Sequence, residues 1–158
     1  MNRTSNDPDP RTYPQRRNPR LPPSVYATHR TVHVTWTTHR RQRLLASPPL
    51  AALTLGVVAA RPETLAACIM PDHVHWLLET NRLTDSVNRV KSVTTALFWR
   101  QGRDGKIWQR SFYDRVLRSG DDRRRVAEYV VANPVRAGLV SEVDAYPWTV
   151  VWWSRFGD

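Results

Sequence analysis

Two apolar runs joined by a two-residue turn constrain this sequence more than any other feature. The runs are Leu65-Ala-Ala-Cys-Ile-Met70 and His73-Val-His-Trp-Leu-Leu-Glu79, and the turn between them is Pro71-Asp72. Short apolar runs with branched and aromatic residues, separated by such a turn, are typical of an antiparallel hairpin. We therefore expect an antiparallel sheet in which the second strand of the hairpin begins at His73.

His73 and His75 are separated by one residue in that strand. Alternate residues of a strand point to one face, so the two imidazoles are expected about 7 Å apart on the same side. With a third ligand from another element they can bind one metal ion; the alternative is a pair of partly exposed strand histidines. Asp72 either accepts a hydrogen bond from an imidazole or only makes the turn.

The rest of the chain alternates between strand-like and helix-like patterns. Alternating β-branched residues predict strands at 31–38 and 112–117, and apolar residues at helical spacing predict helices at 48–60, 84–101 and 121–133. With the hairpin, this order predicts an α+β fold of the ferredoxin-like βαββαβ type. We expect a four-stranded antiparallel sheet with helices on one face and an additional C-terminal helix.

A basic, proline-rich segment precedes this pattern. We expect residues 1–23 to form a disordered tail and residues 24–158 to form a single domain with a Trp-rich C-terminal end. Cys68 is the only cysteine, which excludes an internal disulfide. The longest nearly apolar stretch, 50–60, is too short to cross a membrane, and no apolar leader is visible, so we expect a cytoplasmic protein.

The charge balance favours a nucleic-acid partner. Lys and Arg total 24 against 14 Asp and Glu, for a net charge of +10, and nearly all the cations are arginines. The guanidinium group binds phosphate through a planar fork of donors. The alternatives are a basic surface kept for solubility and a codon bias toward arginine. The candidate DNA contacts are Lys91, Ser92, Arg110, Arg115, Arg123, Arg124 and Arg125.

The last predicted helix contains a second pair of chemically interesting residues. Tyr129 and Asn133 are four residues apart and share a face if the helix persists, although Pro134 favours an end or a kink there. The tyrosine hydroxyl is a possible nucleophile, and the asparagine carbonyl suits a hard divalent ion. A site of two His and one Asn would polarise a phosphate for attack by Tyr129. The alternative is that Tyr129 belongs to the core, because it lies in an apolar stripe.

Five sequence blocks, in this order, resemble the REP-associated tyrosine transposases, which are IS200-like, single-tyrosine HUH enzymes (His-hydrophobic-His). The resemblance covers about residues 30–148. The blocks are Val32-His-Val-Thr-Trp-Thr-Thr38, Met70-Pro-Asp-His-Val-His-Trp-Leu-Leu-Glu79, Val90-Lys-Ser92, Trp108-Gln-Arg-Ser-Phe-Tyr-Asp-Arg-Val-Leu-Arg118 and Glu128-Tyr-Val-Val-Ala-Asn-Pro-Val-Arg-Ala-Gly-Leu-Val140.

The resemblance implies a function as well as a fold. It implies His73, His75 and Asn133 as ligands of Mg²⁺ or Mn²⁺, and Tyr129 as the nucleophile. Such enzymes cut single-stranded DNA beside hairpins, form a 5′-phosphotyrosine with a free 3′-OH, and can rejoin strands as monomers or homodimers. Two alternatives stay open: a non-catalytic module that binds hairpin DNA, and a ferredoxin-like RNA-binding domain. Tyr113 is a rival nucleophile, but it lacks the partner four residues later.

Overall fold

The computed structural model of the chain describes residues 22, 24, 27–118 and 121–157, so nearly all of the predicted tail lies outside the described residues. The helices and strands are β1 (Arg30–Thr37), α1 (Pro48–Ala59), β2 (Thr64–Met70), β3 (His73–Thr80), α2 (Leu83–Arg100), β4 (Tyr113–Val116), α3 (Arg123–Val131), α4 (Asn133–Arg136) and β5 (Thr149–Val151). Short 3₁₀ turns occur at His39–Arg41, Leu44–Ala46, Val143–Ala145 and Trp153–Arg155. No helix in these ranges is long and apolar enough to cross a membrane.

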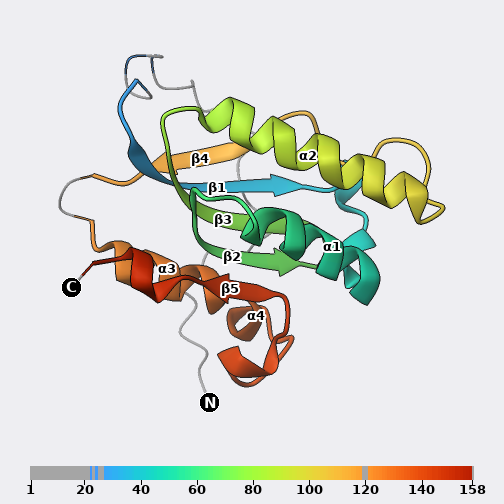
Figure 1. Cartoon of the computed structure of the whole chain (residues 1–158). Helices are drawn as coiled ribbons and strands as arrows, with labels where there is room; N and C mark the ends of the chain where they lie inside the picture. The colour runs from blue at the N-terminus through green and yellow to red at the C-terminus, as the bar shows by residue number, and fades with distance from the viewer. Residues whose placement is uncertain (1–21, 23, 25–26, 119–120, 158) are drawn as a thin grey trace.

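The five strands form one antiparallel sheet in the order β4-β1-β3-β2-β5 (Figure 1). β2 and β3 form the predicted hairpin, with Cys68 opposite His75. On the other side of β3, β1 places Thr35 opposite His75 and Thr37 opposite His73. Because directly opposed residues share a face of the sheet, side chains of three neighbouring strands gather around the two histidines.

The βαββαβ order of the first six elements agrees with the prediction, but the number of strands does not. Thr149–Val151 adds a fifth strand, β5, which pairs with β2 from Ala66 to Cys68. The sequence predicts only an aromatic segment packed on the domain at this place. Three residues are too few to show the alternation that marks a strand, so pairing with β2 is what makes this segment extended.

The helices form two layers, one on each face of the sheet. α1 and α2 share one buried cluster with the strand residues Val34, Trp36 and Trp76, whereas α3 packs through Ala127 and Val130 against a second cluster. The second cluster contains Leu77, the neighbour of Trp76 in β3. Successive residues of a strand face opposite ways, so α3 covers the opposite face of the sheet from α1 and α2. The prediction of helices on one face agrees with α1 and α2, and the additional C-terminal helix, for which no face was predicted, packs on the other face.

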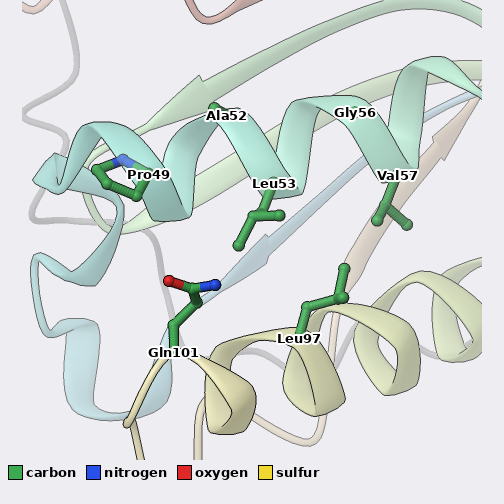
Figure 2. A pocket seen from close by; sticks show the side chains of 7 residues that line it. All are labelled: Pro49, Ala52, Leu53, Gly56, Val57, Leu97 and Gln101. Carbon is green, nitrogen blue, oxygen red and sulfur yellow. The ribbon is translucent and has the colours of Figure 1, made fainter.

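An open apolar groove runs between α1 and α2. It is lined by Pro49, Ala52, Leu53, Gly56, Val57, Leu97 and Gln101 (Figure 2). His73, His75 and Leu77 are alternate residues of β3, so their side chains point to the same face of the sheet. This is the face opposite α1 and α2. The groove is thus separate from the predicted histidine site.

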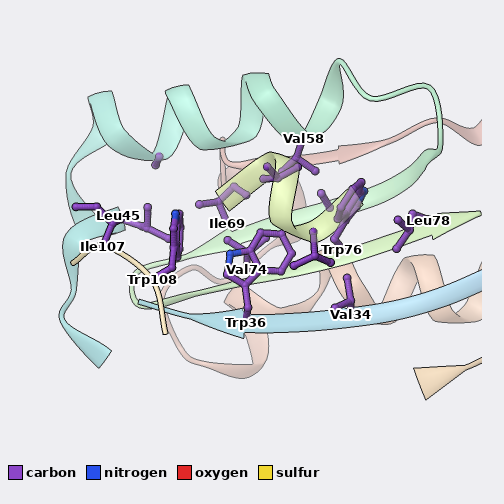
Figure 3. Packing of buried hydrophobic residues seen from close by; sticks show 14 of the residues in the cluster. Val34, Trp36, Leu45, Val58, Ile69, Val74, Trp76, Leu78, Ile107 and Trp108 are labelled. Carbon is purple, nitrogen blue, oxygen red and sulfur yellow. The ribbon is translucent and has the colours of Figure 1, made fainter. Parts of the chain in front are cut away.

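Three tryptophans form the centre of the core beneath α1 and α2. The ring of Trp36 lies edge-on to those of Trp76 and Trp108, with both centroid distances at 6.1 Å (Figure 3). The indole of Trp76 donates to Thr64 Oγ1 and that of Trp108 donates to Thr94 Oγ1, each at 2.9 Å. Buried aromatic rings of this size each remove about 150–250 Å² from water, which makes this layer a firm support for β1 and β3.

α3 begins with a side-chain cap and ends where proline predicts. The Asp122 carboxylate accepts hydrogen bonds from the backbone amides of Arg124 and Arg125. The helix ends at Val131, and α4 starts at Asn133 with Pro134 in its first turn. Proline suits the first turn of a helix, where its missing N–H has no intrahelical partner. The break therefore divides the predicted C-terminal helix just after Tyr129.

Candidate active site on the histidine face of the sheet

The two histidines of β3 bring their Nε2 atoms within 3.1 Å of each other. Two ligand atoms at about 2.1 Å from one octahedral ion, on adjacent positions, are about 3.0 Å apart. Their spacing therefore fits two neighbouring positions around a divalent cation. His73 lies at the start of the strand and is partly exposed, so a ligand can approach from the solvent side.

The other ring nitrogen of each histidine is held by a neighbouring side chain. His73 Nδ1 lies 2.5 Å from Asp72 Oδ1, and His75 Nδ1 lies 3.2 Å from Thr35 Oγ1. His75 Nδ1 is also 3.1 Å from His33 Nε2. Donation from Nδ1 leaves the lone pair on Nε2, as is common in metal-binding histidines. With both rings protonated at Nδ1, two Nε2 lone pairs would face each other, and a shared cation would relieve their repulsion.

The surroundings of His75, Asp72 and His33 lower the pKa of each of these three groups. His75 is only 7% exposed, and burial, followed by the nearby His73 and His33, puts its pKa well below the usual value. Neutral imidazole is the form that binds metals. The hydrogen bond from His73 lowers the pKa of Asp72, which keeps that carboxylate charged. Burial, together with nearby arginines, lowers the pKa of His33 to about 4.

Tyr129 lies on the surface beside these histidines and is not a core residue. Its side chain is 45% exposed, and its ring stands edge-on to His33 with the centroids 6.2 Å apart. Arg136 Cζ lies 3.8 Å from the centre of the tyrosine ring, and Arg136 Nη2 donates to the Tyr129 carbonyl at 2.8 Å. The chain of contacts Tyr129–His33–His75 links the candidate nucleophile to the histidine pair.

Asn133 marks the turn between α3 and α4. Its Nδ2 donates to the backbone carbonyls of Tyr129 and Val130, at 3.2 and 2.9 Å. These two bonds use the amide nitrogen and not the carbonyl oxygen Oδ1. Among the described residues, no group of three or more His, Cys, Asp and Glu side chains is arranged to hold a metal ion.

Tyr113 lies on the same face of the sheet as His33 and His75. It begins β4, directly opposite Thr35 of β1, and it is 50% exposed. Opposed residues share a face, so Tyr113 lies on the same side of the sheet as Thr35 and His75. Both tyrosines are thus near the histidines, and the choice between them has to be tested by mutation.

The predicted DNA contacts are divided between the two faces of the sheet. On the α2 side, Ser92 and Arg110 line a groove between α2 and the loop at 105–110. Lys91 on the same helix is buried, and its Nζ donates to the carbonyls of Gln109 and Ser111 at 2.9 and 3.1 Å. Lys91 therefore holds this loop in place, a structural role that its sequence position does not suggest.

The other predicted contacts lie on the histidine side. Arg115 is opposite His33 in the sheet, and its Nη2 lies 3.7 Å from Asp121 Oδ2. At the start of α3, Arg123 forms an ion pair with Glu79 at 2.8 Å, while Arg124 and Arg125 are exposed. These arginines give the face that carries Tyr129 a positive rim.

The sequence allows His33 to face the histidine pair, although an ordinary face residue is the alternative, and it does not single out Thr35 or Arg136. His33 and Thr35 contact His75, and Arg136 covers the ring of Tyr129. The alternation of β1 does place His33 and Thr35 on one face, but only the register of β1 against β3 shows that this is the histidine face. Arg136 is seven residues after Tyr129, which corresponds to two helical turns, yet the break before α4 obscures that signal.

We predict that Asp72→Asn weakens Mn²⁺ binding by about 10–100-fold, because the amide is a poorer acceptor for His73 Nδ1. Titration calorimetry of the metal-free protein with Mn²⁺ measures this change. Asp104→Asn, in the exposed loop after α2, is the matched control and should leave the affinity unchanged. Equal Mn²⁺ affinity for Asp72→Asn and the wild type would mean that Asp72 only makes the turn.

Comparison with known proteins identifies relatives of this chain. The family model described as "Transposase IS200 like" matches residues 26–133. A REP-associated tyrosine transposase of Escherichia coli is 28% identical over 116 residues, which cover 70% of this chain and 69% of that protein. A Haemophilus influenzae protein assigned to the same group is 30% identical over 101 residues, or 55% of this chain. This chain spans 57% of the Haemophilus protein's length.

A solved structure has the same architecture. It shows a REP-associated tyrosine transposase bound to a REP hairpin, with 26% sequence identity and a TM-score of 0.61. The match covers 76% of this chain and 75% of the other. The α+β fold with its antiparallel sheet is thus shared with a tyrosine transposase. Because the family model matches residues 26–133, which are more than half of this chain, the chain belongs to the IS200-like transposase family.

Proposed function

We propose that this protein is an HUH endonuclease and strand transferase that cleaves and rejoins single-stranded DNA beside a hairpin. The observation that carries this proposal is the 3.1 Å separation of His73 Nε2 and His75 Nε2, next to an exposed tyrosine. The related structure contains a REP hairpin, and we propose a hairpin of this kind as the substrate. Residues 24–158 would act as one catalytic domain, with β1 to β4 as its ferredoxin-like core.

His73, His75 and Asn133 would hold the divalent ion, through the two Nε2 atoms and Asn133 Oδ1. A bound Mg²⁺ or Mn²⁺ supplies positive charge to the oxygens of the scissile phosphate and so favours attack on phosphorus. Asp72 and Thr35 hold the imidazoles in the tautomer that leaves both Nε2 atoms free for the ion.

Tyr129 would supply the nucleophile. Its Oη attacks the phosphorus in line, a new bond between Oη and phosphorus forms, and the bond to the 3′ oxygen breaks. The phenol proton passes to the surrounding water as the attack proceeds, and the departing 3′ oxygen takes up a proton from water to become the free 3′-OH. The 5′ side of the DNA remains attached as a 5′-phosphotyrosine.

Rejoining is the reverse of cleavage. A 3′-OH attacks the phosphotyrosine, and Tyr129 leaves with its oxygen. One phosphoester replaces another in each step, so the reaction needs no ATP. The guanidinium of Arg136 lies against the ring of Tyr129, where it holds the side chain in place and adds positive charge beside the attacked phosphate.

The two other readings differ in what they require of these residues. A module that only binds hairpin DNA has no need for a histidine pair with both Nδ1 atoms held. An RNA-binding sheet of this topology stacks bases on strand aromatics. Here the face beside His75 carries His33 and Thr35 from β1, and among the described strand residues Tyr113 alone contributes an exposed aromatic ring.

The test is a denaturing gel with labelled single-stranded hairpin DNA, run with and without Mn²⁺. We expect a protein–DNA adduct that survives denaturation and forms only when the metal is present. An assay with a chelator controls for adducts that form without metal. Tight hairpin binding without any adduct, on hairpins with either flank unpaired, would instead support the binding module.

A further inference from the structure

Two exposed tryptophans follow β5, at the edge of the sheet. Trp152 and Trp153 are 40% and 43% exposed. Arg124 Cζ lies 5.8 Å from the ring centre of Trp153, and Arg155 Cζ lies 5.8 Å from that of Trp152. We call these four residues the Arg–Trp surface. It brings cations and aromatic rings together at a place that solvent reaches.

Hydrogen bonds to β2 and the turn before it hold the Arg–Trp surface in place. The Trp152 amide donates to the Leu65 carbonyl at 2.9 Å. Arg155 Nη1 donates to the carbonyls of Pro62 and Thr64, at 2.6 and 2.9 Å. The surface is therefore ordered before any partner arrives, which lowers the entropy lost on binding.

Neighbouring side chains extend the same pattern. Arg123 Cζ lies 5.8 Å from the ring centre of Phe156, and the rings of Phe156 and Trp153 are 5.4 Å apart. Arg123 also pairs with Glu79, so its charge is partly balanced within the protein. Arg124 forms no such ion pair with a carboxylate of the described residues. Its Nη2 donates to the Gly157 carbonyl at 3.3 Å. Arg124 and Arg155 are thus the exposed cations of the Arg–Trp surface, and Arg124 is the one on α3.

The outer face of α3 connects the Arg–Trp surface to the candidate nucleophile. Arg124, Arg125, Glu128 and Tyr129 are all exposed on this helix. Five residues of helix span about 7.5 Å, which is the length of roughly two nucleotides of a strand. A strand that lies across α3 therefore reaches from the Arg–Trp surface to Tyr129, with Glu128 as the one exposed carboxylate on this stretch of the helix.

We infer that the Arg–Trp surface binds the unpaired strand that flanks the hairpin. Bases of this strand would stack on Trp152 and Trp153, while Arg124 contacts a phosphate. Unpaired bases offer free faces for stacking, whereas bases within a duplex do not. The inference rests on the proposed function, because it requires a single-stranded substrate. The tryptophans lie outside residues 26–133, the part of the chain that the family model matches.

The experiment compares two labelled DNAs by fluorescence anisotropy: a hairpin with an unpaired flank and the same hairpin without it. A chelator is present throughout, so that no cleavage occurs. We expect Trp153→Ala to weaken binding of the flanked hairpin roughly tenfold and to leave binding of the bare hairpin unchanged. Trp153→Tyr keeps an aromatic ring and should restore most of the affinity.

Two matched controls are available on the other face of the sheet. Trp99 on α2 is 54% exposed, and Trp99→Ala should not change binding of either DNA.

Arg124→Ala should reduce the salt dependence of flanked-hairpin binding by about one unit of slope. Arg103→Ala, in the exposed loop after α2, removes the same charge and should leave that slope unchanged.

Several results would overturn the inference. Unchanged affinity of Trp153→Ala for the flanked hairpin would remove the Arg–Trp surface as a DNA contact and leave the proposed function standing. Equal weakening on both DNAs would indicate a structural role. Without DNA, a smaller sedimentation coefficient for Trp153→Ala than for the wild type would show that this surface joins two copies of the chain. Failure of the wild type to bind either hairpin would overturn the proposed function as well.

Discussion

Tyr129→Phe is expected to abolish the covalent protein–DNA adduct and to leave hairpin binding within about twofold of the wild type. Phenylalanine keeps the ring beside His33 and under Arg136, but it lacks the oxygen that attacks phosphorus. Loss of a covalent nucleophile typically lowers the rate by a factor on the order of 10³ or more. A denaturing gel with labelled hairpin DNA and Mn²⁺ measures the adduct, and anisotropy measures binding.

Tyr113→Phe is the matched control, because Tyr113 is the other exposed tyrosine on this face of the sheet. It should form the adduct at a rate close to that of the wild type. An adduct that persists in Tyr129→Phe and disappears in Tyr113→Phe would identify Tyr113 as the nucleophile. Loss of the adduct in both variants, with folding unchanged by circular dichroism, would mean that both tyrosines are needed.

His73→Ala is expected to remove metal-dependent cleavage. It deletes one of the two Nε2 atoms that are 3.1 Å apart and leaves His75 as a single histidine ligand. We expect Mn²⁺ affinity to fall by at least 100-fold, and cleavage at a fixed, low Mn²⁺ concentration to fall by a factor on the order of 10³. Electron paramagnetic resonance of Mn²⁺ reports the binding, and the gel assay reports cleavage.

His73 is a suitable position for this test because it is partly exposed, so the alanine variant should fold. His29→Ala, an exposed histidine before β1, serves as the matched control and should change neither measurement. The hypothesis of a histidine metal site would fail if His73→Ala bound Mn²⁺ and cleaved DNA as the wild type does. High Mn²⁺ concentration should partly rescue the variant if His75 and Asn133 still bind the ion.

Local patterns in the sequence were sufficient to predict most of the elements. The hairpin around Pro71-Asp72, the helix that starts at Pro48 and the end of α3 before Pro134 all follow from residues close together in the chain. The face shared by His73 and His75 follows from strand geometry alone. β5 could not be predicted in this way, because its three residues become a strand only through pairing with β2.

Side chains with two possible roles were harder to assign. The apolar stripe of the last helix made a core position possible for Tyr129, and the structure shows it exposed. Lys91 was predicted as a phosphate contact, whereas its ammonium group lies among backbone carbonyls of the loop after α2. A helical pattern shows which residues share a face, but the docking of the helix decides whether that face is buried.

The sequence by itself determined the order of the elements, the hairpin and the common face of the two histidines, since these depend on short-range periodicity and turn chemistry. Only the tertiary structure decided what surrounds the histidines. His33 reaches His75 because β1 pairs with β3 in one register, and Tyr129 reaches His33 because α3 packs on that face. Such contacts join residues 42 or more positions apart, and burial of the core fixes them together.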